Sequence, residues 1–242
     1  NMSDNEINTE FKGKRDEMTT YAQEKQSVLE ICQTLLKQGY LKTTEGNVSV
    51  RVNQEDAFAI TPSSYDYALM NVDDICVLNF DLTQKEGERK PSIESAMHAA
   101  VYQVRPDVHV IIHTHQPYAS ALGIINKPIP HLFDEQVRFL GRSVEIIPYA
   151  PSGTGFLKKN VLKKVRNGNN AFILQNHGVL VLGGNAELAI HNMALLEKCA
   201  LDYLLALMTG EKVSKIPLVV REIAFSQLRA DEKKLANLTK EE

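Results

Sequence analysis

The spacing of hydrophobic residues changes along the chain, and each change marks the boundary of a predicted helix or strand. Apolar residues three or four positions apart are typical of amphipathic helices, and short runs rich in β-branched residues are typical of strands. Helices are predicted over 25–39, 92–104, 155–168 and 186–210. Strands are predicted over 47–52, 57–62, 75–81, 108–115 and 144–149. Because helices and strands are interleaved, the predicted fold class is α/β.

Two segments carry more specific expectations. The run 169–184 is rich in β-branched residues and predicts either one long strand or a tight hairpin. The segment "SIESAMHAAVYQV" follows the helix-breaking Pro91, and Ser92 is its expected N-cap. The apolar stripe expected to be buried on this helix consists of Ile93, Met97, Ala100, Val101 and Val104.

The chain divides into three parts. Residues 1–20 form a polar N-terminal segment, and residues 21–210 carry the alternating elements of one α/β domain. Residues 211–242 form a C-terminal extension in which an amphipathic helix is expected after Pro217. The partner of that helix is open between the body of the chain, a neighbouring subunit and another protein.

Composition and charge narrow the class of protein. The 242 residues are 43% hydrophobic and 24% charged, as in ordinary globular proteins. The formal net charge of −3 gives no broad basic surface, so nucleic acid is not an expected partner. No apolar run approaches the ~20 residues of a membrane span, and no N-terminal signal is visible. Cys32, Cys76 and Cys199 are expected to be buried free thiols, which fits a cytoplasmic location.

The candidate chemistry begins in "HVIIHTHQP", residues 109–117. Residues two apart on a strand point to the same face, so His113 and His115 present two imidazoles side by side. "LQNHG" places His177 at the end of another apolar run. Three neutral imidazoles with open coordination positions are typical of a catalytic zinc site, where the metal polarises a substrate carbonyl. For the pair alone, two hydrogen-bonded histidines at a strand end are the alternative.

Glu94 is the candidate acid or base. It lies in the first turn of the helix predicted over 92–104, where the helix dipole favours a carboxylate, so a capping charge is the alternative. Beside a metal, and partly desolvated, its pKa is expected to rise toward neutral pH. The other histidines have simpler expected roles. His98 is expected to be a hydrogen-bonded residue of its helix, with a metal ligand as the alternative, and His109 is expected at the surface. His131 lies in a loop that could reach a site, and His191 is expected in packing or at an interface.

Taken together, "EGNVSVR", "ITPSS", "KPSIESAMHAAVY", "IIHTH" and "LQNHG" resemble the class II aldolase/adducin family. The resemblance implies a three-layer α/β/α fold with a central, mainly antiparallel sheet. It implies a divalent metal, zinc or otherwise Mn²⁺ or Co²⁺, with His113, His115 and His177 as ligands and Glu94 as the acid/base. It also implies a homotetramer with active sites at subunit interfaces.

The motifs are closest to those of the family's fuculose-phosphate aldolases, which hold a phosphate with an Asn, a Thr-Gly pair and a Ser-Ser pair. Here Asn47 matches the Asn, Ser63 and Ser64 replace Thr-Gly, and Ser92 matches the first serine of the last pair. Ile93 replaces the second serine, which removes one donor. The four polar residues are therefore implied to bind the substrate, since hydroxyls and N–H groups at turns suit an anion.

Those aldolases also use a tyrosine from a neighbouring subunit as a proton donor. Asp134 lies near the equivalent place, with Glu135 beside it, and Asp134 is the expected second catalytic residue. A solvated loop charge is the alternative for both carboxylates.

The predicted function is a zinc-dependent lyase acting on a sugar phosphate, a small ketose phosphate of the L-fuculose 1-phosphate kind. It would yield dihydroxyacetone phosphate and an aldehyde through a metal-stabilised enediolate. A ribulose-phosphate 4-epimerase, a methylthioribulose-1-phosphate dehydratase and a metal-dependent decarboxylase are alternatives on the same scaffold. A non-catalytic, adducin-like interaction module is more remote, because the three metal histidines and Glu94 are retained.

Overall fold

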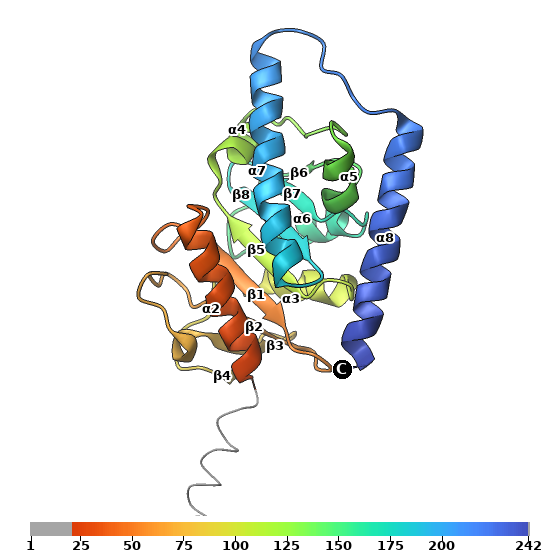
Figure 1. Cartoon of the computed structure of the whole chain (residues 1–242). Coiled ribbons are helices and arrows are strands. Elements are labelled where there is room, and N and C mark those ends of the chain that lie inside the picture. The colour runs from red at the N-terminus through yellow and green to blue at the C-terminus, as the bar shows by residue number, and fades with distance from the viewer. Residues whose placement is uncertain (1–20, 242) are drawn as a thin grey trace, which may run out of the picture.

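The structure, a computed structural model, describes residues 21–241 and is built around one eight-stranded sheet (Figure 1). The polar segment predicted over 1–20 lies outside the described residues. The strands follow the order β4-β3-β2-β1-β5-β8-β7-β6, and only β6 and β7 pair in parallel. Their bounds are β1 Asn47–Arg51, β2 Ala57–Ile60, β3 Cys76–Asn79, β4 Gln84–Glu86, β5 Val110–Thr114, β6 Glu145–Ile147, β7 Ala171–Leu174 and β8 Gly178–Gly183.

Helices cover both faces of the sheet. Successive side chains of a strand point to opposite faces, so Ile112 of β5 joins the apolar cluster under α2, α4 and α7, whereas Ile111 joins the cluster under α3 and α6. The helices are α2 Ala22–Lys37, α3 Ser95–Val104, α4 Pro117–Ile124, α5 Asp134–Leu140, α6 Gly155–Val165, α7 Ala186–Met208 and α8 Leu218–Glu241, with a short 3₁₀ helix at Val72–Asp74. The predicted three-layer α/β/α fold with a mainly antiparallel sheet is confirmed.

The segment 169–184 is a hairpin and not one long strand. β7 and β8 pair antiparallel, with Leu174 opposite Gly178. The turn between them contains Asn176 at a φ of 53°, a left-handed conformation that asparagine adopts more readily than most residues. This turn brings His177 back toward the end of β5.

The helix predicted from Ser92 begins later, at Ser95, and Ser92 is not its N-cap. Glu94 holds the N-cap position, and the Ser92 hydroxyl accepts a hydrogen bond from the Glu94 N–H at 3.2 Å. Ile93 lies in the turn before the helix and therefore does not follow the helical stripe. Its side chain is 55% exposed, so the expectation that Ile93 is buried in the core is wrong.

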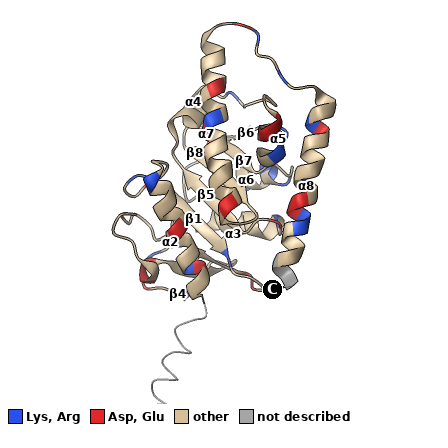
Figure 2. Cartoon of the chain, viewed as in Figure 1, with Lys and Arg blue, Asp and Glu red and all other residues tan. Residues whose placement is uncertain are grey.

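The predicted helix after Pro217 is present as α8, and it packs on the body of the chain. A connection over 209–217 leads from the end of α7 to α8, which runs beside α5 (Figure 1). Phe225 and Leu228 of α8 share a buried cluster with Val137 of α5. Acidic and basic side chains both occur along α8 (Figure 2). In the described part of the chain, neither α8 nor any other helix is long and apolar enough to cross a membrane.

Candidate active site

Four segments that are distant in sequence meet at one end of β1 and β5. Asn47, the first residue of β1, is the register partner of His113 on β5. Glu94 precedes α3, and His177 lies in the turn between β7 and β8. These residues border a pocket of about 230 Å³. Its other lining residues are Thr44, Glu45, Gly46, Pro62, Ser63, Ser64, Ser92, Ile93, His115 and Ser152.

The three histidines predicted as metal ligands lie together. One ring nitrogen from each of His113, His115 and His177 is within 4.8 Å of the others, and the ring centroids are 4.7 to 5.3 Å apart. His113 and His115 share a face of the strand as predicted, with their Nε2 atoms 3.2 Å apart. Thr114 points the other way, toward Met193 of α7. Three imidazoles are therefore gathered from two strand ends around one point.

The surroundings of His113 fix its tautomer. Its Nδ1 lies 2.7 Å from the carbonyl oxygen of Val179, which can only accept, so Nδ1 carries the proton. Nε2 then presents a lone pair to Oε2 of Glu94 at 3.1 Å and to Nε2 of His115 at 3.2 Å. Burial lowers the pKa of His113 to about 4, so the ring is neutral at pH 7. A neutral nitrogen donor beside a carboxylate, oriented by a backbone carbonyl, fits a divalent cation.

Two glycines allow the backbone to close tightly around β5. A Cβ at Gly178 would lie 2.4 Å from the carbonyl oxygen of Thr114 and 2.7 Å from Cδ2 of His115. A Cβ at Gly46 would lie 2.4 Å from the carbonyl oxygen of His113, and Gly46 also has a φ of 83°. Any side chain at either position would displace the histidine-bearing strand end.

Glu94 is buried, and its two carboxylate oxygens differ. Oε2 accepts a hydrogen bond from Nδ2 of Asn47 at 2.8 Å. Oε1 has no hydrogen-bond partner among the described residues and lies 3.5 Å from Nε2 of His177. The expectation of a raised pKa is wrong. Burial alone would raise it, but His113, the Asn47 amide, His177 and His98 together outweigh burial, so the pKa of Glu94 lies below its usual range. The carboxylate is therefore ionised at neutral pH, and Oε1 is its oxygen without a hydrogen-bond partner among the described residues.

The serines predicted to bind the substrate all line the pocket. The N–H of Ser63 donates to the carbonyl of Lys90, and the N–H of Ser92 donates to that of Thr61, so these two backbone donors are already used. The Ser92 hydroxyl accepts from Glu94 N–H and keeps its own proton for another acceptor. Ser64 sits at a φ of 55°, at the turn after β2. The polar groups offered by the serines are thus mainly hydroxyls.

Asn47 also lines the pocket, but its side chain is largely committed elsewhere. Its Nδ2 donates to Glu94, and its Oδ1 lies 2.6 Å from Nε2 of His98. Only the second N–H of the amide is left for a substrate. The sequence motif could place this residue at the site but not reveal that it bridges a helix histidine and the carboxylate.

Asp134 and Glu135 are exposed at the start of α5 and are not among the residues that line this pocket. Glu135 lies 3.9 Å from Nε2 of His191, whose ring packs edge-on against Phe139. The role predicted for Asp134 requires a neighbouring subunit and stays a prediction. His131 is also absent from the pocket lining.

Three residues of the pocket were missed by sequence reasoning. Ser152, in the loop after β6, has its hydroxyl 3.3 Å from Nε2 of His177. Glu45 lies 3.7 Å from Nδ1 of His115. Thr44 completes the same rim. The only sequence signal was position: Thr44 and Glu45 adjoin the Gly46 turn, and Ser152 lies in the turn-forming "PSGTG".

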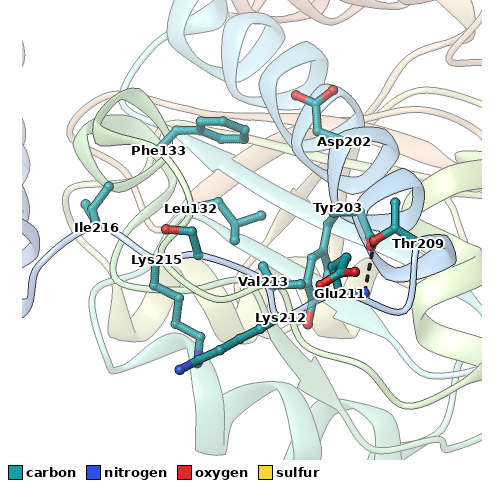
Figure 3. A pocket seen from close by; sticks show the side chains of 12 residues that line it. Leu132, Phe133, Asp202, Tyr203, Thr209, Glu211, Lys212, Val213, Lys215 and Ile216 are labelled. Carbon is teal, nitrogen blue, oxygen red and sulfur yellow. Dashed lines mark hydrogen bonds between the residues drawn. The ribbon is translucent and has the colours of Figure 1, made fainter.

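A larger pocket of about 360 Å³ lies away from the histidines, between the end of α7, the 209–217 connection and the segment before α5 (Figure 3). Tyr203, Leu132 and Val213 line it, with Lys212 and Lys215 on the connection. It contains no histidine and none of the predicted site residues. The smaller pocket is therefore the candidate site, because nitrogen and carboxylate donors converge there.

Comparison with known proteins identifies the family of the chain. The sequence profile of the family described as "Class II Aldolase and Adducin N-terminal domain" matches residues 26–204. The chain belongs to this family. The predicted family resemblance is thus confirmed, and with it the expectation of an enzyme of the class II aldolase type.

Individual members of the family are similar over most of their length. The 5-deoxy-D-ribulose 1-phosphate aldolase of Bacillus thuringiensis is 30% identical over 188 residues, covering 78% of this chain and 87% of the relative. The L-fuculose phosphate aldolase of Haemophilus influenzae is 33% identical, covering 81% and 88%. A solved structure of an L-fuculose 1-phosphate aldolase superposes with a TM-score of 0.81 at 33% identity, covering 86% of this chain and 97% of that one.

Proposed function

We propose that this chain is a zinc-dependent lyase that cleaves a small ketose phosphate to dihydroxyacetone phosphate and an aldehyde. The observation that carries the proposal is the convergence of three imidazoles and of Glu94, whose Oε1 has no hydrogen-bond partner among the described residues, at a single pocket. The names of the relatives, which act on 1-phosphates of 5-deoxyribulose and fuculose, support this substrate class. Mn²⁺ and Co²⁺ suit the same donors, and zinc is the first choice for an all-imidazole set.

His113, His115 and His177 would hold the cation, which when bound supplies a Lewis acid for the ketose carbonyl. The remaining chemistry falls to the chain. In cleavage, the electron pair of the broken carbon–carbon bond stays with the ketone fragment. The hydroxyl proton of the other fragment is lost as its carbonyl forms, and the ketone fragment gains a proton at carbon. Oε1 of Glu94, a residue that lines the pocket, is proposed to deliver that proton after the resting carboxylate has taken one up from solvent water, while the proton lost from the hydroxyl returns to solvent, so that protons balance.

The hydroxyls of Ser63, Ser64 and Ser92 are proposed to hold the phosphate, together with the remaining N–H of Asn47. Ile93 is exposed at the rim of the same pocket and offers no hydrogen bond from its side chain. Substrate positioning therefore depends on the serine hydroxyls, because two of the nearby backbone N–H groups are already paired.

Asp134 of a neighbouring subunit is proposed to accept the hydroxyl proton of the leaving aldehyde. This assignment needs a homo-oligomer, proposed as a tetramer, since Asp134 is exposed and lies outside the pocket of its own chain. A reducing cytoplasm is the proposed location and suits the three buried free cysteines. Sedimentation of the protein as a monomer with full activity would contradict the assignment of Asp134.

One experiment tests the proposal. Protein loaded with zinc is incubated with a panel of ketose 1- and 5-phosphates, and triose phosphate release, epimerisation, water loss and CO₂ release are followed. Release of dihydroxyacetone phosphate is the expected outcome. Epimerisation, dehydration or decarboxylation as the sole reaction would replace the lyase by the corresponding alternative, and failure to bind any divalent metal would favour an interaction module.

The metal site itself is tested by His113→Ala. Because His113 is fully buried and its orientation is fixed by Val179, its loss removes the most rigid of the three nitrogen donors. Zinc content measured by atomic emission is expected to fall to background, and activity with it. His109→Ala, just before the start of β5 and away from the pocket, is the control and is expected to keep zinc. A zinc-free His113→Ala protein with full activity would contradict the proposed function.

A further inference from the structure

A chain of buried polar side chains leads away from the pocket behind Glu94. Oε2 of Glu94 accepts from Nδ2 of Asn47 at 2.8 Å, and Oδ1 of Asn47 lies 2.6 Å from Nε2 of His98. Nδ1 of His98 lies 2.6 Å from the Ser49 hydroxyl, which lies 2.7 Å from the hydroxyl of Tyr102. All five residues are no more than 5% exposed. The chain therefore runs from the pocket wall into the core between β1 and α3.

The direction of each hydrogen bond follows from Glu94. An ionised carboxylate can only accept, so the amide nitrogen of Asn47 must face it and the amide oxygen must face His98. An amide oxygen also only accepts, so Nε2 of His98 carries the proton. Nδ1 of His98 is then the acceptor, and Ser49 donates to it. The donors of Asn47, His98 and Ser49 therefore all point toward the carboxylate.

The alternative tautomer of His98 would be incompatible with this arrangement. With the proton on Nδ1, Nε2 would present a lone pair to Asn47, and the amide would have to turn over to donate to it. The amide oxygen would then face Oε2 of Glu94 at hydrogen-bond distance, and two acceptors would be in contact in a buried site. Burial also lowers the pKa of His98 to about 3, which favours the neutral ring.

We infer that His98 is a positioning residue which, acting through Asn47, holds Oε2 of Glu94 and so keeps Oε1 in its orientation beside Nε2 of His177. His98 does not line the pocket, and its two ring nitrogens are both occupied, so it touches no substrate. The inference rests on the proposed function only in giving Oε1 its catalytic task. A carboxylate that is free to rotate about its last torsion would spend much of its time in orientations that cannot reach the substrate.

The main test compares His98→Leu with His98→Gln, and His109→Gln serves as the matched control. Leucine removes both hydrogen bonds of the ring. Glutamine keeps an amide donor for Asn47 and an oxygen acceptor for Ser49. We expect kcat of His98→Leu to fall on the order of tenfold to a hundredfold, with KM within about twofold of wild type and zinc content unchanged. His98→Gln should recover most of kcat, and His109→Gln should match wild type, because His109 contacts Asn53 at the far end of β5.

Two measurements do not depend on turnover. The ¹⁵N shifts of the His98 ring in the zinc-loaded wild type should show the Nε2–H tautomer, and an Nδ1–H tautomer would overturn the inference. Crystal structures should show the Glu94 carboxylate in one orientation in wild type and His98→Gln, and rotated or in two orientations in His98→Leu. If His98→Leu does not fold, Ser49→Ala takes its place. That variant removes only the Ser49 hydroxyl, which donates to Nδ1 of His98 and so favours the Nε2–H tautomer.

The outcomes separate this inference from the proposed function. If wild type binds zinc but cleaves no sugar phosphate, the proposed function fails, while the tautomer and the Glu94 orientation are still decided by spectroscopy and crystallography. If wild type is active and His98→Leu keeps its kcat, the inference is overturned and the proposed function stands. A kcat loss in His98→Leu that is matched by zinc loss, or that glutamine does not rescue, means that His98 is structural and also overturns it.

Discussion

The substitution Gly178→Ala tests whether the close packing of the β7–β8 turn against β5 is needed to position the histidines. In Gly178→Ala the new Cβ would lie 2.4 Å from the Thr114 carbonyl and 2.7 Å from the His115 ring, so β5 or the β7–β8 turn must move. We expect a loss of stability of about 1–3 kcal/mol, typical of overpacking, and weaker zinc binding in a competition assay. Gly155→Ala is the control, because a Cβ there meets nothing within 4 Å and a helix position favours alanine. Equal zinc affinity in both variants would contradict the expected role of this close approach.

Glu94→Gln separates metal binding from proton transfer. The three histidines are unchanged, so zinc content should stay at wild-type level. Glutamine cannot take up and return a proton at the Oε1 position, so turnover should fall by about 10²–10⁴, the range for general acid–base residues. Zinc analysis measures metal binding, and single-turnover kinetics measure the chemical step, so the two effects are checked independently. Unchanged turnover would remove Glu94 from the proposed reaction, whatever the zinc content.

The residue types at the site could be read from the sequence, but their mutual restraints could not. The strand period correctly placed His113 and His115 on one face, since that geometry depends only on local backbone. The pKa of Glu94 was predicted with the wrong sign, because it depends on His113 and Asn47, which reach it from other elements of the fold. Local sequence patterns identify the residue type and its secondary structure. The direction of a pKa shift depends on the neighbouring groups in the folded chain, which local patterns do not show.

At the scale of elements, two kinds of contact could attach α8 to the rest of the chain: a buried apolar cluster and an ion pair. Phe225 is 6% exposed and packs with Val137 and Leu228, whereas the Arg142–Glu222 ion pair is half-exposed and partly screened by solvent. We therefore expect Phe225→Ala to lower the free energy of unfolding by about 3 kcal/mol. Ile223→Ala, an apolar truncation at an exposed position of the same helix, should cost less than ~0.5 kcal/mol. Urea denaturation of both variants measures the difference, and equal losses would show that the buried face is not what holds α8.

Elements with a regular spacing of hydrophobic residues were predicted correctly. Features that depend on packing between elements could not be predicted from the sequence. The long helix α7 and the strand β5 follow directly from their apolar spacing. Whether 169–184 turned at its centre could not be decided, because the turn residues Gln175–His177 carry no glycine or proline. The docking of α8 was likewise open, since an amphipathic stripe shows that a partner exists but not which one.

At the scale of the whole molecule, the neutral buried His98 makes stability depend on pH. Its pKa falls from about 6.5 in the unfolded chain to about 3 in the fold, because burial disfavours the charged ring. The stabilisation is therefore complete above pH 6.5 and is lost as the pH falls from 6.5 toward 3. At pH 5 the unfolded chain gains about 2 kcal/mol from protonating this one residue (1.5 pH units at 1.36 kcal/mol each).

Other groups titrate in the same range, so the prediction is made as a difference between two proteins. Burial raises the pKa of Glu197 and of Glu232, and both therefore stabilise the fold as the pH falls, opposite in sign to His98. These groups are common to wild type and His98→Gln, and their effect cancels in the comparison. Between pH 7.5 and pH 5, wild type should lose about 2 kcal/mol more stability than His98→Gln at equal zinc content. Parallel stability profiles from urea denaturation would mean that His98 is not held neutral by the fold.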